Sequence, residues 1–480
     1  MSPRRSLATL LTVSLAACLC ASCADVSEDA WQPPRIVRIE GAEGAYSVSP
    51  MYGTLFSTAI EKADQGEEPV KALEATTYVL ARPGELVALK KGGPFPYAAE
   101  DGTNLSIKEE DDRVTLGDRV VTIRLEDEET LTWLAQAPEA DLAGLRMIDV
   151  GDMVPEEGEA AAVREAITRL AKVNPRVGVS MGEQAPVGML LEMYDPPWLS
   201  IDGIVPDAQF QDLLAAEPNL HTLMMKGRAE GGLGFLSRLP HLRTLFLSEW
   251  EGEDDDAPPP LPTMLSLRTL ILFGAEIKDL APVGSQPNLE ELVIALSKDL
   301  TDLSRLSQMP RLRALVLANC EAVTDLSALA SLRNLRWLGL PQATTQEQFA
   351  RLSKNHPDLA VLQADTCEGV TDLSPVKGLQ KLQVLTVPSP ALLGPLTEAT
   401  PIRLLGLAPR GSSGDEAPDA EKRLTETLVK VMEANPDLAV VQVSPLCLGS
   451  GWILFLAPAT AGAWWLARRR RRSVAARDDG

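Results

Sequence analysis

Leucines recur through the second half of the chain in a phrase that alternates apolar and polar positions. Each phrase opens with a leucine, and two further apolar residues follow three and five positions later. The opening leucines are Leu220, Leu242, Leu267, Leu289, Leu312, Leu335, Leu359 and Leu382, at steps of 22 to 25 residues. The last two apolar positions share one face of an extended strand, and one strand cannot bury that face alone. Stacked copies therefore predict a parallel sheet over one continuous core.

Several segments between these phrases carry helical spacing instead. Apolar residues recur at helical intervals within 163–170, 210–214, 349–352 and 424–431, and each run ends at a proline-containing stop. Helices on the outer side and strands on the inner side require the sheet to curve. We therefore expect an α/β solenoid, a curved horseshoe with parallel β-strands on its concave face.

The repeat phrase resembles the leucine-rich repeat family, most closely the bacterial internalin type. The resemblance rests on the L-x-x-L-x-L opening, on Cys320 and Cys367 in equivalent places, and on the word Thr-Asp-Leu-Ser, which begins at Thr301, Thr324 and Thr371. It implies a leucine-rich-repeat horseshoe over residues 141–446. It also implies that Cys320 and Cys367 are buried structural thiols, with a bridge or a metal pair as the alternatives.

The segment 24–140 does not follow the repeat phrase. A polar tether covers its first residues, and short β-rich runs punctuated by Gly and Pro follow, from Ile36, Thr77, Glu85 and Arg119. These runs predict a small β-rich domain. Because a solenoid needs its open apolar end covered, this domain is a candidate cap for the first repeat.

The chain begins with an export signal over residues 1–23. Arg4 and Arg5 precede an apolar run that is too short to span a bilayer comfortably. Within it, Leu-Ala-Ala-Cys ending at Cys18 resembles a bacterial lipobox, and Cys23 is a rival position for the lipidated cysteine. Ordinary signal-peptide cleavage without lipid is the alternative.

A second membrane signal lies at the other end. Residues 447–467 contain no charge and include Trp464 and Trp465 near their end, and the basic tail 468–480 follows with Arg468 to Arg472. This predicts a transmembrane helix with a cytoplasmic tail. The segment also resembles a bacterial C-terminal sorting signal, which is the alternative.

The net charge and the positions of the histidines disfavour several classes of function. The formal net charge is -22, and removing the eight basic and two acidic residues of the end segments leaves 37 basic and 65 acidic residues, a charge near -28. Such a balance disfavours nucleic acid and anionic membrane surfaces as partners. The only histidines, His221, His241 and His356, lie in separate repeats, so neither a multi-histidine metal site nor a His-based triad is expected. We expect no metal, no cofactor and no catalytic site.

The sequence pattern predicts a binding surface on the sheet. Residues between the core-facing positions should point to the concave surface, and five in succession are apolar. This concave face comprises Thr222, Met224, Thr244, Phe246, Thr269, Ile271, Glu291, Val293, Val316 and Trp337. A contiguous apolar patch is typical of a binding site, whereas packing against the N-terminal domain is the alternative.

Together these features predict an exported, membrane-anchored leucine-rich repeat protein of the bacterial cell envelope, with its ectodomain outside the cytoplasm. It should bind a protein partner through the concave sheet without a catalytic step. Two alternatives from other classes stay open: an envelope enzyme whose site lies unrecognised in the N-terminal domain, and a purely structural envelope protein.

Overall fold

The computed structural model describes most of the repeat region and a set of strands ahead of it. The described residues are 35–40, 46–47, 56–62, 70–73, 76–81, 85–89, 93–97, 105–109, 113–116, 119–125, 128–150, 160–182, 194, 196–201, 208–217, 219–229, 231–252, 257–408 and 418–443. All of them belong to one compact unit, Arg35–Gly480.

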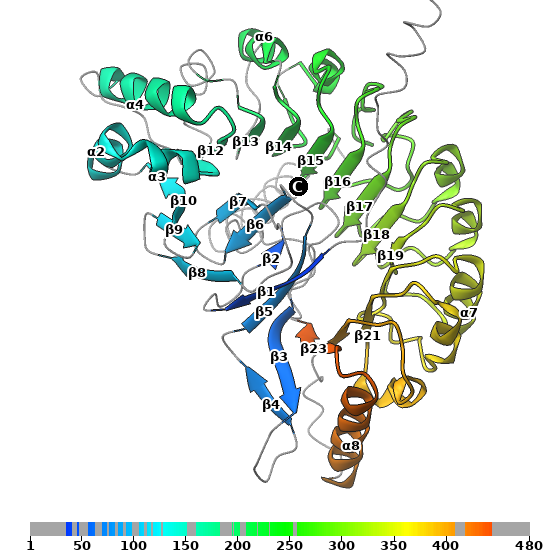
Figure 1. Ribbon diagram of the computed structural model, residues 1–480. Coiled ribbons are helices and arrows are strands. Elements are labelled where there is room, and N and C mark those ends of the chain that lie inside the picture. Colours follow the sequence, from blue (N-terminus) through cyan, green and yellow to red (C-terminus); the bar gives the residue numbers. More distant parts are fainter. Residues whose placement is uncertain are drawn as a thin grey trace, which may run out of the picture. The chain divides into compact units, whose positions relative to one another are not determined.

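Fourteen parallel strands form the backbone of this unit (Figure 1). Each pairs with the next strand along the chain, so sequence order and spatial order agree. The strands are β10 (Arg119–Arg124), β11 (Met147–Asp149), β12 (Gly178–Met181), β13 (Trp198–Ile201), β14 (Thr222–Lys226), β15 (Thr244–Ser248), β16 (Thr269–Phe273), β17 (Glu291–Ala295), β18 (Ala314–Ala318), β19 (Trp337–Gly339), β20 (Val361–Gln363), β21 (Val384–Val387), β22 (Leu404–Leu407) and β23 (Ala439–Val443). The fold is a leucine-rich-repeat solenoid, as the sequence predicted.

The leucine spacing creates one continuous core. All eight opening leucines, from Leu220 to Leu382, are at most 1% exposed. They belong to a single apolar cluster that runs from Ile123 to Val440 and includes the core-facing residue pairs of the strands. Each strand therefore buries its apolar face against its neighbours and against the return segments, which is how a solenoid is stabilised.

The return segments contain α-helices at the four places where helical spacing was predicted and at two more, and several other return segments contain 3-10 helices. The α-helices are α2 (Glu128–Gln136), α3 (Glu139–Gly144), α4 (Ala160–Val173), α6 (Ala208–Ala216), α7 (Gln346–Asn355) and α8 (Pro418–Ala434). The 3-10 helices are η2 (Leu233–Arg238), η3 (Ser304–Gln308), η4 (Ser327–Ser331), η5 (Ser374–Gly378), η6 (Pro390–Leu392) and η7 (Gly394–Leu396). All four helical segments expected from the sequence are confirmed.

The Thr-Asp-Leu-Ser word has a local physical role. In each copy the aspartate carboxylate accepts a hydrogen bond from the backbone N–H of the serine two residues later, at 2.7 Å for Asp302, 2.8 Å for Asp325 and 2.8 Å for Asp372. This bond satisfies a donor at the start of η3, η4 or η5 and lowers the pKa of each aspartate. The Thr-Asp-Leu-Ser sequence therefore starts a 3-10 turn at the same place in these three repeats.

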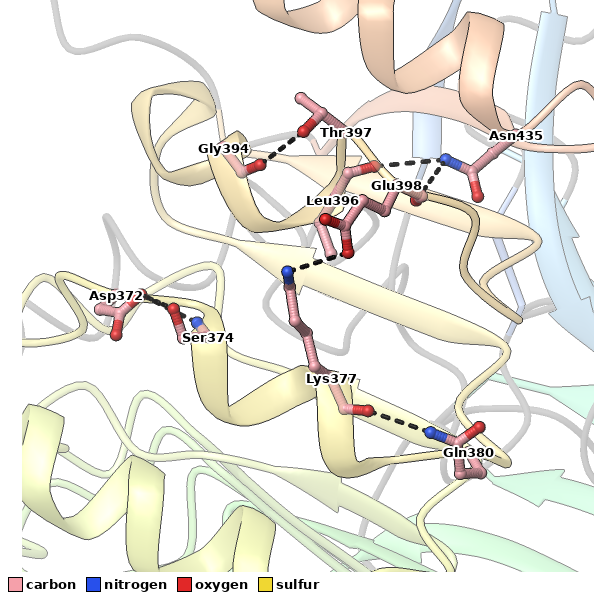
Figure 2. Close-up of polar contacts among 9 residues, drawn as sticks. All are labelled: Asp372, Ser374, Lys377, Gln380, Gly394, Leu396, Thr397, Glu398 and Asn435. Atoms are coloured by element: carbon pink, nitrogen blue, oxygen red, sulfur yellow. Dashed lines mark hydrogen bonds and ion pairs between the residues drawn. The ribbon is translucent and has the colours of Figure 1, made fainter.

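Side-chain amides fix the last repeats to one another. Asn435, at the end of α8, donates from Nδ2 to the carbonyls of Leu396 and Glu398 at 3.3 and 3.4 Å (Figure 2). Lys377 reaches the carboxylate of Glu398 at 3.1 Å in the same region. Because Asn435 is buried, these bonds satisfy carbonyls that the return segments would otherwise leave without partners.

The N-terminal segment is β-rich, as predicted. Its strands are β1 (Arg35–Glu40), β2 (Tyr46–Ser47), β3 (Phe56–Lys62), β4 (Val70–Leu73), β5 (Thr76–Ala81), β6 (Glu85–Leu89), β7 (Gly93–Tyr97), β8 (Leu105–Glu109) and β9 (Arg113–Leu116). Strands β2, β6 and β7 form a small separate sheet, and the other six join the large one.

These six strands connect to both ends of the parallel array. At the first end β9 pairs antiparallel with β10, and at the last end β3 pairs antiparallel with β23 (Figure 1). Between them, β3 meets β5 at Phe56↔Tyr78, β5 pairs with β1, β1 with β8 and β8 with β9. The N-terminal segment therefore pairs with both the first and the last strand of the parallel array.

The boundary between the two regions lies earlier than predicted. The sequence placed the start of the repeats at residue 141, but β10 (Arg119–Arg124) already pairs in parallel with β11. The physical reason is that β10 carries the alternating pattern of a repeat strand, with Ile123 in the leucine core, while the segment before it lacks an opening leucine.

A disulfide trap tests the pairing of the first strands with the last. Ala59 and Val441 are register partners in the β3–β23 ladder. Antiparallel partners have Cα atoms about 4.5 to 5.5 Å apart, which is within the range that a disulfide bridges. We expect the Ala59→Cys, Val441→Cys variant to form an intramolecular bridge on mild oxidation, detected by peptide mass spectrometry. Ala59→Cys with Ala391→Cys, in η6 (Pro390–Leu392), is the control and should stay reduced. Equal bridging in both variants would contradict the pairing.

Candidate functional site on the inner sheet face

The strand register places the five predicted apolar residues in one row. Met224 pairs with Phe246, Phe246 with Ile271, Ile271 with Val293, and Val293 with Val316. We call this row the column. It belongs to the sheet face opposite the leucine core, because none of its members is in the core cluster while their strand neighbours are. The predicted register is confirmed residue by residue.

A second row runs beside the column. Its members are also register partners along β14 to β19, and they are Thr222, Thr244, Thr269, Glu291, Ala314 and Trp337. The structure therefore brings all ten predicted site residues onto one face of six adjacent strands.

The column is buried. Its five members are only 4 to 8% exposed, and Thr269, Glu291 and Trp337 in the second row are also buried, whereas Thr222 and Thr244 are partly exposed. An open binding surface was the prediction here, and packing against the N-terminal domain was the alternative. Strand pattern assigns a residue to one face of the sheet but carries no information on what packs against that face.

Polar groups on this face are paired with one another. Thr269 donates from Oγ1 to the Glu291 carboxylate at 2.9 Å, and Trp337 donates from Nε1 to Oε1 of Gln363 at 3.0 Å. Beside them the rings of Phe246 and Phe273 stack with centroids 6.4 Å apart. Because a buried polar group without a partner is costly, these bonds let the face be apolar and buried at once.

Beyond Val316 the column changes from bulky to small and polar. It continues through Gly339, Gln363 and Thr386. A side chain at Gly339 would be crowded, since a Cβ there would lie 2.8 Å from Cγ1 of Val316 and 3.0 Å from Oε1 of Gln363. The absence of a side chain at Gly339 therefore leaves room for the amide that accepts the Trp337 indole bond.

A partly buried hydrogen-bonded chain follows the polar end of the column. The Thr386 hydroxyl donates to the Asp365 carboxylate at 2.5 Å and accepts from the backbone N–H of Ala364 at 3.0 Å. Desolvation raises the pKa of Asp365, which these bonds only partly offset. Asp365 is therefore a group whose ionisation opposes folding.

The same face extends beyond the residues that the sequence identified. Trp198 and Ser200 on β13 pair with Thr222 and Met224, and both are buried. The Trp198 ring lies over Gly178, where a Cβ would come within 2.1 Å of it. The degenerate repeat phrase before Leu220 hid this part of the face, and the glycine opposite a tryptophan on the next strand was the available signal.

The described residues offer few groups for metal binding or catalysis. Among them, no group of three or more His, Cys, Asp and Glu side chains could bind a metal ion. Cys320 and Cys367 are free and buried, as expected for structural thiols, and desolvation raises the pKa of each to about 12. Burial also lowers the pKa of His356, because desolvation disfavours the charged imidazole.

Three predicted features fall outside the described residues. They are the lipidation candidates Cys18 and Cys23 and the apolar segment 447–467. Within the part of the chain that the structure describes, no helix combines the length and the apolar character needed to cross a membrane.

Comparison with known proteins finds similarity at the level of solved structures only. A scan of protein-family models gives no match to this chain, and a search of curated proteins gives none. An internalin from Listeria monocytogenes is 18% identical over 57% of this chain and 86% of that chain, with a TM-score of 0.36. Internalin C2 from the same organism is 20% identical over 43% and 76%, with a TM-score of 0.26. A leucine-rich-repeat protein of Leptospira interrogans is 12% identical over 66% and 99%, with a TM-score of 0.26.

The close packing around Gly339 predicts a sharp response to one methyl group. Gly339→Ala should destabilise the protein by about 1 to 3 kcal/mol, because overpacking forces Val316 or the Gln363 amide to shift. Gly378→Ala is the control, since no atom lies within 4 Å of a Cβ there. Chemical denaturation of both variants measures the difference. Similar stability of the two variants would contradict the packing of the column.

The raised pKa of Asp365 predicts a pH dependence with a definite sign. In the folded protein the carboxyl holds its proton to a higher pH than in the unfolded chain, so its contribution to stability is present below pH about 4 and is lost as pH rises through the folded-state pKa. Asp365→Asn keeps an acceptor for Thr386 and removes the titration. We expect the variant to match the wild type in acid and to exceed its stability near pH 7, as measured by denaturation at each pH. A constant difference across pH would contradict this assignment.

Proposed function

We propose that this protein is an exported, membrane-anchored recognition module of the bacterial cell envelope that binds a protein partner through the inner sheet face, without catalysis. The contact surface is the column with its flanking row, from Thr222 to Trp337. The observation that carries this proposal is the register that brings Met224, Phe246, Ile271, Val293 and Val316 into one apolar row outside the leucine core.

The apolar row is more than the core requires. The leucine core already buries the other face of each strand, so a second apolar face needs a second cover. Apolar area of this kind is the usual source of affinity in protein interfaces, with aromatic residues such as Phe246 and Trp337 as anchors. Because this row is only 4 to 8% exposed, a partner gains access by displacing the residues that bury it.

The second proposal concerns where the protein is located. Its support is the sequence at the two ends: the export signal with Cys18 or Cys23 as the lipidated residue, and the apolar segment 447–467 with its arginine cluster. Together they hold the repeat domain outside the cytoplasm and close to a membrane. A partner is then another protein of the envelope or its surroundings.

A purely structural envelope protein is the second candidate. The burial of the column favours it, because residues that pack permanently against the chain's own strands contribute to stability and leave no surface for a partner. The two candidates differ in one observable: whether the column is ever in contact with another molecule.

Site-specific photo-crosslinking separates these candidates. Benzoyl-phenylalanine in place of Phe246 introduces a reactive ketone within an aromatic side chain of similar shape, and the same residue in place of Arg351, exposed on α7, is the control. We expect irradiation of envelopes to join position 246, but not position 351, to a second protein in defined stoichiometry.

The crosslinked peptide decides the outcome. An intermolecular product specific to position 246 supports the recognition module. Crosslinks from position 246 that reach only residues of its own chain, under every growth condition in which the protein is made, would overturn partner binding through this face and leave the structural candidate.

A further inference from the structure

The turns that lead into the strands form a basic edge of the sheet. Because the strands are parallel, these turns all lie at one edge. The last four residues before each of β15 to β22 contain eight cations and two carboxylates. The cations are Arg243, Arg268, Arg311, Arg313, Arg333, Arg336, Lys381 and Arg403, and the carboxylates are Glu290 and Asp358.

Each carboxylate of this basic edge is shared by two cations. Glu290 lies 3.6 Å from Arg268 and 3.9 Å from Arg313. Asp358 lies 3.5 Å from Arg336 and 2.7 Å from Lys381. The remaining four cations are exposed and form no ion pair within the described part of the chain. The basic edge therefore keeps a net positive charge within a strongly acidic protein.

The turns that follow the strands form the opposite, acidic edge. In the described residues after β15, β16, β17, β18 and β20 these turns hold eleven exposed or partly exposed carboxylates and two lysines. The carboxylates are Glu249, Glu251, Glu276, Asp279, Asp299, Asp302, Glu321, Asp325, Asp365, Glu368 and Asp372, and the lysines are Lys278 and Lys298. One of these carboxylates, Glu251, forms an ion pair with Arg228. The serine bonds that lower the pKa of Asp302, Asp325 and Asp372 keep these groups ionised.

The two edges are opposite in sign and cover overlapping sets of strands. The basic edge precedes β15 to β22, the acidic edge follows β15 to β18 and β20, and neighbouring strands lie about 4.8 Å apart. Like charges along an edge repel one another, so each edge gains from a counter-charged surface. A second copy of this chain presents such a surface, because its opposite edge carries the opposite charge on strands shared by both edges.

We infer that two copies of this protein associate edge to edge, with the basic edge of one copy against the acidic edge of the other. The contact is head-to-tail, so each copy keeps one free edge and further copies can add. Leu265 supports the location. It is 69% exposed, the only large hydrophobic residue that is exposed among the described residues, and it lies in the basic edge beside Arg268. The contact uses the edges and not the column, so it is independent of the proposed function.

Salt dependence gives the first test. Sedimentation velocity of the purified full chain in a mild non-ionic detergent should show concentration-dependent association. Raising the salt concentration from about 0.1 M to about 1 M shortens the screening length from about 10 Å to about 3 Å, and the association constant should fall at least about tenfold. A full chain that stays monomeric at about 0.1 M salt and high micromolar concentration overturns the inference.

Charge reversal on one edge at a time gives the decisive test. The basic-edge variant carries Arg243→Glu, Arg333→Glu and Arg403→Glu, and the acidic-edge variant carries Glu276→Lys, Glu321→Lys and Glu368→Lys. All six residues are exposed, so folding should be unaffected, which circular dichroism and thermal unfolding confirm. Neither variant should associate alone. Their mixture should form a one-to-one dimer and nothing larger, because only one productive pair of edges remains.

Other occupants of the basic edge give different results. If it binds an unrelated polyanion, polyglutamate and vesicles of anionic phospholipid should bind the acidic-edge variant and not the basic-edge variant, and the mixture of variants should stay monomeric. That result, or association that persists in both variants alone, overturns the edge-to-edge contact. A matched control variant, Arg351→Glu on α7, is outside both edges and should associate like the wild type.

Discussion

The structure depends on one constraint: a strand whose leucines face one side cannot bury them alone. Every copy of the repeat gains its stability from the copies on either side, and the opening leucines from Leu220 to Leu382 are almost inaccessible to solvent as a result. The same constraint leaves two exposed ends. The N-terminal strands meet both, through β9 at the first strand and β3 at the last. The segment that does not follow the repeat phrase is thus the one that completes the array.

Features that depend on local periodicity could be predicted from the sequence. Because side chains alternate along a strand, the positions of the leucines fixed which residue faces which side, and Met224, Phe246 and Ile271 lie in the predicted row. Helical spacing before a proline likewise located α4 and α7. The burial of the column could not be predicted, because alternation assigns a residue to a face and does not say what packs against that face. Two residues on or beside this face were not predicted. Trp198 lies in a repeat whose leucine pattern is degenerate. The role of Asp365 depends on its surroundings and on a hydrogen bond from Thr386.

The inner face joins two environments. Its first strands carry bulky apolar residues, and its later strands carry Gly339, Gln363 and Thr386 with paired polar groups. The bond from Trp337 to Gln363 lies at the junction. A surface that changes from apolar to hydrogen-bonding along its length has a direction, so whatever covers it is held in one orientation. The two charged edges of the sheet add a second polarity, along the strands, which is independent of the first.

The pairing of β3 with β23 has a consequence for how the molecule is made. The strands synthesised first find their final partner only after the last repeat has left the ribosome, several hundred residues later. Contacts between such distant segments form slowly, because the intervening chain loses much freedom when its ends meet. The repeats can assemble one after another as they emerge, but β3 must wait with its pairing edge unfilled. A chain truncated near its end would therefore leave that edge open, and open strand edges are where aggregation begins.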